Sequence, residues 1–375
     1  MKLNEKLKKT MTMIVGGFIL FIAIIALISR CNRERVYTIE EMGELKARLI
    51  EIARSHYRNN EDALPSEGES IVLSIQALVD AGRMSPLNRI IENGENCSGQ
   101  ITVMNNRGYI LYLPKIDCGE LYQTKRLTDV ILDSENIVTT GNGLYVMNNG
   151  FVFRGETVNN HIYFANRLWV ILRINTDGSI KIMEVPRRSA VAWDNRFNPE
   201  RNSTSGINEF INNNINSRIR DRLESIYADD REFTDLDRAH IIPQNLCIGK
   251  RALTDTINDG SIECAQTLPN QTLGLIAVYQ YLQASLDENC INTTSPSCVN
   301  FNYLANLTPA FWTITADSET SFRAFRINRN LSLINTSNTS SIKVTALLTG
   351  EALISEGDGS AEYPFILTTS QATST

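Results

Sequence analysis

The hydrophobic pattern of this chain begins with an uninterrupted apolar run. Residues 11–29 read MTMIVGGFILFIAIIALIS and carry no charge. A helix of that length is about 28 Å long, close to the ~30 Å hydrocarbon core of a bilayer. Basic residues flank the run on both sides, so the positive-inside rule orients it only weakly. The pattern predicts a transmembrane anchor at 11–29, preceded by a cytoplasmic tail at 1–10.

A cleaved signal peptide is the alternative interpretation of the same run. Signal peptides usually have an apolar core of about 7–15 residues, followed by a cleavage site with two small residues. Here the run is longer and ends in Ser29, Arg30 and Cys31. We therefore favour an anchor that stays in place.

The apolar positions after the run recur at helical spacing. Thr38 and Glu41 fit a capping box, in which each residue bonds the backbone of the other at the start of a helix. The spacing predicts a helix over 39–57. A second, short helix is predicted at 74–81, with Gly82 as its stop.

Alternating strands dominate the rest of the chain. The turn sequences NNRG and NNG each separate two apolar runs and predict hairpins. The predicted strands are 100–104, 109–113, 144–147, 151–154, 161–165, 168–174, 179–185, 311–315, 324–327 and 341–348. Amphipathic helices are predicted at 206–226 and 272–284. This mixture predicts an α+β fold.

The seven cysteines bear on the cellular compartment in which the chain folds. Cys31 borders the apolar run, and the other six form three sequence-local pairs, Cys97 with Cys118, Cys247 with Cys264, and Cys290 with Cys298. Six cysteines allow 15 connectivities, so local pairing is a hypothesis; buried free thiols are the alternative. A zinc site would need closer Cys or His spacing than the chain has. Disulfides would place residues 30–367 outside the cell.

Composition excludes one class of partner. The net charge is −6, and no basic face is evident beyond the short N-terminus. A nucleic-acid-binding protein would concentrate Lys and Arg on one surface, so nucleic acid is not an expected partner. The last residues, 368–375, are polar and are predicted to be a flexible tail.

The order of elements resembles that of a pilin or pseudopilin. An apolar helix is followed by its amphipathic extension and a small β region, and segments 57–65 and 73–82 look like the same region of pilin-like Gram-positive surface proteins. The resemblance implies a pilin-like stalk domain at 30–135 and pilin-like subunits as partners. Pilins carry a Glu inside the apolar helix, whereas this run has none, which favours anchoring over filament assembly.

A second resemblance covers 164–367. The region is similar to the C-terminal part of uncharacterised surface proteins, mostly of Firmicutes. The segments that carry it are RLWVILRI (167–174), DGSI (177–180), WDN (193–195), FWTIT (311–315), GDGS (357–360) and PFI (364–366). It implies a larger α+β domain at 136–367 with a C-type-lectin-like scaffold.

The sequence has few motifs that indicate catalysis or metal binding. There is no H-E-x-x-H or G-x-S-x-G motif, and the acidic cluster at 229–237 alternates with arginines. We expect no catalytic residues, metal or cofactor. Trp193, Trp312 and Phe311 are the predicted ligand-binding residues, because aromatic side chains bind sugars and protein partners well. A packed core is the alternative role for them.

Together these patterns predict a non-enzymatic, single-pass membrane protein. Its C-terminal region would be extracellular and would bind a glycan or a protein, as in adhesion. The alternative is a pseudopilin-like structural component of a secretion or pilus apparatus.

Overall fold

The computed structural model describes residues 37–58, 60–147, 150–196 and 206–367. The predicted anchor at 11–29 and the tails at 1–10 and 368–375 lie outside the described residues. In the part that is described, no helix has the length and apolar character needed to cross a bilayer. The fold is mixed α and β with far more strand than helix, which confirms the α+β class in outline.

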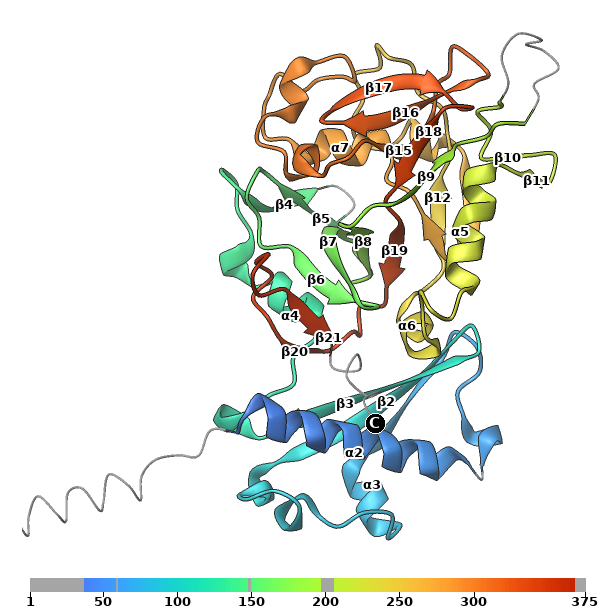
Figure 1. Ribbon diagram of the computed structural model, residues 1–375. Helices are drawn as coiled ribbons and strands as arrows, with labels where there is room; N and C mark the ends of the chain where they lie inside the picture. Colours follow the sequence, from blue (N-terminus) through green and yellow to red (C-terminus); the bar gives the residue numbers. More distant parts are fainter. Residues whose placement is uncertain (1–36, 59, 148–149, 197–205, 368–375) are drawn as a thin grey trace, which may run out of the picture.

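The chain forms a small lobe, residues 37–124, and a large lobe, residues 125–367 (Figure 1). The small lobe contains α2 (Ile39–Arg58), β1 (Ser70–Ser74), α3 (Ile75–Asp80), β2 (Ser98–Asn106) and β3 (Tyr109–Asp117). The helices of the large lobe are α4 (Leu127–Ile131), α5 (Arg218–Ala228), α6 (Asp235–His240) and α7 (Val278–Ala284). Helix α4 lies within the range predicted for the stalk, yet it packs in the large-lobe core.

The large lobe is built on two main sheets. The nine-stranded sheet contains β4 (Gly143–Met147), β5 (Gly150–Arg154), β6 (His161–Phe164), β7 (Arg167–Ile174), β8 (Ile180–Glu184), β14 (Leu273–Gly274), β19 (Thr345–Leu348), β20 (Ile354–Glu356) and β21 (Phe365–Leu367). The five-stranded sheet contains β9 (Arg188–Ala192), β15 (Phe311–Ala316), β16 (Arg323–Asn328), β17 (Asn330–Asn335) and β18 (Thr339–Ile342). Two short ribbons are β10 (Ile211–Asn212) with β11 (Ile215–Asn216), and β12 (Gln244–Cys247) with β13 (Thr267–Gln271).

Helix α2 begins where its capping box predicts. The Thr38 backbone N–H donates to the Glu41 carboxylate at 3.0 Å, and the Glu41 N–H donates to Thr38 Oγ1 at 3.1 Å. The helix lays one apolar row, including Leu49 and Ala53, against the three-stranded sheet β1-β2-β3. Packing of its apolar face on a sheet supplies most of the stability of an amphipathic helix in a protein.

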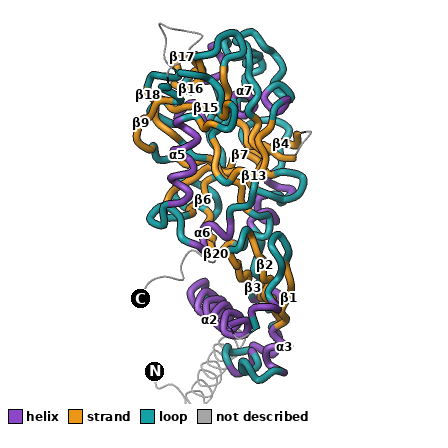
Figure 2. Tube along the Cα trace, turned by 90° about the vertical axis from the view of Figure 1, so that its right-hand side faces the viewer, coloured by secondary structure: helices purple, strands orange, loops and turns teal. Residues whose placement is uncertain are grey.

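The β2–β3 hairpin turns on two left-handed residues. Arg107 has φ of 57° and Gly108 has φ of 85°, as a two-residue type I′ turn requires. The register then runs from Asn106 opposite Tyr109 to Ser98 opposite Asp117. This long hairpin reaches up to the large lobe, where its tip lies beside α6 (Figures 1 and 2).

A bent ribbon joins the two sheets of the large lobe. Strand β8 pairs with β19 in one sheet, and the strands next to them along the chain, β9 and β18, pair in the other. The two chain segments therefore pass together from one sheet to the other. At the bend, the Glu184 N–H donates to the Val344 carbonyl at 2.9 Å.

Three predicted elements are wrong in extent. The helix predicted at 206–226 begins only after Ser217, whose hydroxyl accepts from the Arg220 N–H. Before it, Asn213 and Asn214 adopt positive φ and make the β10–β11 hairpin turn. Asparagine tolerates this conformation and competes with helix, which the apolar spacing alone did not reveal.

The other two corrections concern segments that change sheet or direction. The helix predicted at 272–284 starts at Val278, because residues 273–274 pair with β19 instead. The strand predicted at 341–348 is two strands, β18 and β19, in different sheets. Residues 273–284 and 341–348 are buried throughout, and burial on all sides removes the periodicity that distinguishes helix from strand.

The two lobes touch through the hairpin tip. Leu111 and Leu113 of β3 pack with Ala239 and Leu353 of the large lobe. Beside them, the Asn106 amide donates to the backbone carbonyls of Ala239, at 3.0 Å, and Ile241, at 2.6 Å. Since Asn106 is buried, its amide satisfies two carbonyls that would otherwise have no partner.

Replacing Asn106 tests this contact. We expect Asn106→Ala to lower the free energy of unfolding by about 2 kcal/mol, because it leaves buried carbonyls unsatisfied. Chemical denaturation of the variant and the wild-type chain measures the change. Gln100→Ala, on an exposed position of the same strand, is the control and should change stability by less than about 0.5 kcal/mol. Equal effects of the two substitutions would contradict the role of Asn106.

Candidate functional site

The aromatic residues predicted to bind a ligand are in the core. Trp193, Trp312 and Phe311 each have 0% exposure. The Trp193 indole donates to the Thr313 carbonyl at 3.1 Å, and the Trp312 indole donates to the Val191 carbonyl at 2.8 Å. Apolar packing and satisfied N–H groups explain these residues fully. The prediction of a recognition surface at these positions is therefore wrong.

The third tryptophan is equally enclosed. Trp169 has 0% exposure, donates to the Phe164 carbonyl at 2.8 Å, and packs against Phe164 and Phe233. All three tryptophans of the chain thus lie in the core of the large lobe.

Tryptophan fluorescence checks this placement directly. We expect the tryptophan emission of the native chain to lie at a shorter wavelength than that of the unfolded chain. The emission should also resist quenching by acrylamide, because acrylamide in water does not reach buried indoles. Unfolding should shift the emission to the red and restore quenching. A quenchable fraction of about one third in the native chain would show that one tryptophan is exposed, and would contradict the burial of all three indoles.

Three disulfides cross-link the described part of the chain. They join Cys97 to Cys118, Cys247 to Cys264 and Cys290 to Cys298, the sequence-local pairs. The first lies in the small lobe, and the other two lie in the large lobe. Disulfides of this number fit an extracellular domain, where the environment is oxidising.

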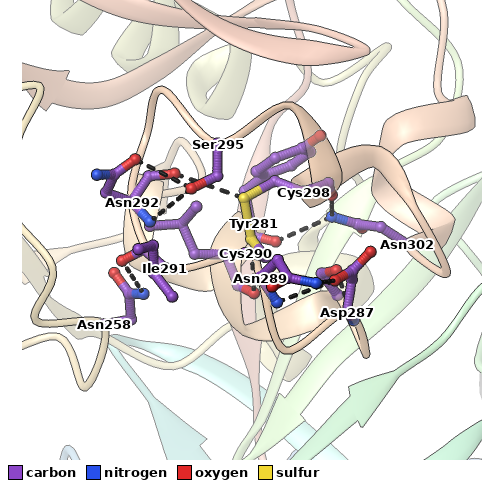
Figure 3. The surroundings of a disulfide bond; sticks show 12 residues. Asn258, Tyr281, Asp287, Asn289, Cys290, Ile291, Asn292, Ser295, Cys298 and Asn302 are labelled. Atoms are coloured by element: carbon purple, nitrogen blue, oxygen red, sulfur yellow. Dashed lines mark hydrogen bonds between the residues drawn. A yellow bond between two sulfur atoms is a disulfide. The ribbon is translucent and has the colours of Figure 1, made fainter.

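The Cys290–Cys298 disulfide closes a loop with its own polar network (Figure 3). Asn302 has 0% exposure, and its amide donates to the carbonyls of Tyr281 and Cys298 at 3.1 and 2.8 Å. The Asn292 side chain accepts from Ser295 Oγ at 3.1 Å. These contacts fix the loop onto α7 and give it a structural role.

The acidic cluster at 229–237 is neutralised by neighbouring arginines and a cap. Asp229 pairs with Arg231, and Arg238 reaches two further aspartates of the cluster. His240 is buried beside Phe164, and burial lowers its pKa. Over the described ranges, no group of three or more His, Cys, Asp or Glu side chains is placed to hold a metal ion.

A polar pocket of about 140 Å³ lies where β7, β8 and β19 meet β12 and the segment before α7. One wall is apolar, formed by Leu246, Leu275, Ile314 and Leu347. The lining residues with polar side chains are Arg173, Asn175, Lys181, Gln244, Asn245 and Tyr279. We call this site the Arg173–Lys181 pocket.

Two cations face each other across neighbouring strands at this pocket. Arg173 of β7 is the direct partner of Lys181 of β8. Burial lowers the pKa of Lys181 to about 8, and the nearby charge of Arg173 acts in the same direction. Tyr279 hydrogen-bonds to Arg173, while burial raises the pKa of its hydroxyl. Of the described lining residues, none is a carboxylate.

Sequence reasoning missed this pocket. Arg173 and Lys181 flank the turn at 175–178, so the predicted hairpin indicates that they lie close together, although their direct pairing needs Ser179 as a fifth residue of the turn. That signal was available in the sequence. The apolar wall was not, because it comes from segments about 70 to 170 residues away along the chain.

Comparisons with known proteins gave no relative whose site could be compared with this pocket. No protein-family model, no curated protein and no solved structure gave a significant match. The chemistry of the site therefore rests on its own residues. The pocket offers hydrogen-bond donors, positive charge and an apolar wall, which are the elements of a small binding site.

Proposed function

We propose that this chain is an extracellular binding protein held at the cell membrane. The observation that carries the proposal is the set of three disulfides, two of them in the lobe that contains the pocket. Disulfides persist in oxidising compartments. The uncharged run at 11–29 supplies an anchor of bilayer length. The resemblances to pilin-like and Firmicutes surface proteins support the same location.

Binding without catalysis is the activity we propose. The Arg173–Lys181 pocket combines donors with an apolar wall, as ligand pockets do. Its described lining has no Ser, no His and no carboxylate to act as nucleophile or base. The ligand would be a glycan or protein at the cell surface, and the large lobe would present the pocket to it.

Topology mapping tests the location. Intact cells expressing the chain are treated with a membrane-impermeant thiol reagent, with and without prior reduction, and in parallel with a protease. We expect cleavage from outside, and labelling of the six paired cysteines only after reduction, because the disulfides block them. A Cys31→Ser chain serves as the control that removes the cysteine beside the anchor.

The opposite result has a definite meaning. Protection from the protease, together with no labelling until the cells are permeabilised, would place the large lobe inside the cell. That outcome would overturn the proposed location.

A further inference from the structure

The Arg173–Lys181 pocket contains an electrostatic conflict. Arg173 and Lys181 are directly opposite on adjacent antiparallel strands, so their side chains leave the sheet on the same face. Like charges at such paired positions destabilise a sheet. The conflict needs a compensating group.

For Lys181, the described residues supply no such group. No hydrogen bond or ion pair joins Lys181 to another described side chain, and the lining has no carboxylate. Two buried arginines of the large lobe each have a carboxylate partner. Arg188 pairs with Glu184 at 2.7 Å, and Arg251 pairs with Glu263 at 3.0 Å. Lys181, which is half-buried, has no such partner among the described side chains.

The rest of the pocket suits a small negative group. The apolar wall, including Leu275 and Leu347, lowers the local dielectric and strengthens attraction to the two cations. Gln244 and Asn245 also line the pocket. The Gln244 amide donates one hydrogen bond to the Thr272 carbonyl at 3.2 Å, and the exposed Asn245 side chain is a further amide donor. A volume of about 140 Å³ admits one compact group but not a polymer segment.

We propose that the Arg173–Lys181 pocket binds a single oxyanion, the phosphate, sulfate or carboxylate group of an extracellular ligand. The inference rests on the proposed binding function and names its ligand class. The oxyanion lies between the two side chains and accepts charge-assisted hydrogen bonds from both. The remainder of the ligand extends into solvent.

Thermal unfolding of the full-length chain in detergent tests the proposal. Inorganic phosphate, sulfate and acetate are titrated separately, with chloride holding the ionic strength constant, and the melting temperature is recorded. A ligand that binds only the folded chain raises this temperature. We expect at least one of the three oxyanions to raise it, and their order identifies the group that the pocket prefers.

Three variants make the test specific. Lys181→Gln should weaken oxyanion affinity by about tenfold or more, which is the loss expected for one charge-assisted bond. Lys181→Arg keeps the charge and should retain binding. Arg187→Gln is the control, since it removes the same charge from an exposed position after β8, and it should bind oxyanion as the wild type does.

The effect on stability without oxyanion separates binding from a structural role. In chloride alone, Lys181→Gln should melt at or above the wild-type temperature, because it relieves repulsion from Arg173. A structural lysine would give the reverse. Reduced melting of Lys181→Gln in chloride, together with unchanged oxyanion affinity, would overturn the proposal.

The pH dependence gives a second readout. The pKa of Lys181 is about 8, so its positive charge, and with it oxyanion affinity, should fall as pH rises through that value. The other titratable groups at the pocket are Arg173 and Tyr279, with Glu263 behind Tyr279 in contact with the Tyr279 N–H. Lys181→Gln should abolish this fall.

Failure of this inference is distinguishable from failure of the proposed function. If none of the three oxyanions stabilises the wild-type chain, or if Lys181→Gln and Arg187→Gln respond equally, the oxyanion site is refuted while the extracellular location stands. If the oxyanion binds but topology mapping places the large lobe inside the cell, the location is refuted while the site stands.

Discussion

The large lobe depends on the bend where β8 continues into β9 and β18 continues into β19, which we call the corner. The buried carboxylate of Glu184 stabilises this corner. Glu184 has 0% exposure and forms ion pairs with Arg167 at 3.0 Å and Arg188 at 2.7 Å. Lys343 lies on the other segment of the same bend, donates to the Val185 carbonyl, and stands 5.5 Å from the centre of the Phe311 ring. Burial raises the pKa of Glu184, and the two arginines oppose that rise.

The corner determines where the two sheets lie relative to each other. Strands β8 and β19 leave one sheet here, and β9 and β18 continue in the other. The Arg173–Lys181 pocket takes its cations from the first sheet and Ile314 from the second. A shift at the bend would therefore separate the apolar wall from the charged side of the pocket. The corner is structural, but the site depends on it.

Removing one partner of a buried ion pair is costly, since it leaves the other charge without compensation. Glu232 shares the arginines, with its carboxylate 2.9 Å from both Arg167 and Arg188. The acidic cluster at 229–237 thus contributes one residue to the corner. That contact links the segment before α6 to the bend, and α6 in turn rests on the β2–β3 hairpin of the small lobe.

Local signals allowed much of the fold to be predicted from the sequence. The capping box of Thr38 and Glu41, the turn at Arg107 and Gly108, and the three sequence-local disulfides each depend on residues close together in the chain. Physical rules for caps and turns act at that range.

What was not predictable depends on distant residues. Trp193 and Trp312 lie in polar or mixed sequence, and only the packing of the two sheets shows that they are buried. The pocket unites segments from β7 to β19, and the bend at 343–344 has no Gly or Pro to mark it. A strand that is buried on both faces shows no alternation of apolar and polar residues. For this reason the sequence predicted one strand at 341–348 where the structure has two.

The free energy of unfolding of Glu184→Gln tests the role of the corner most directly. Glutamine keeps the size of the side chain but removes the charge that pairs with Arg167 and Arg188. We expect a loss of about 3 kcal/mol or more relative to the wild-type chain, as happens when a buried pair is broken. A change below about 0.5 kcal/mol would show that the corner does not depend on Glu184, and would contradict the central place of this carboxylate in the fold.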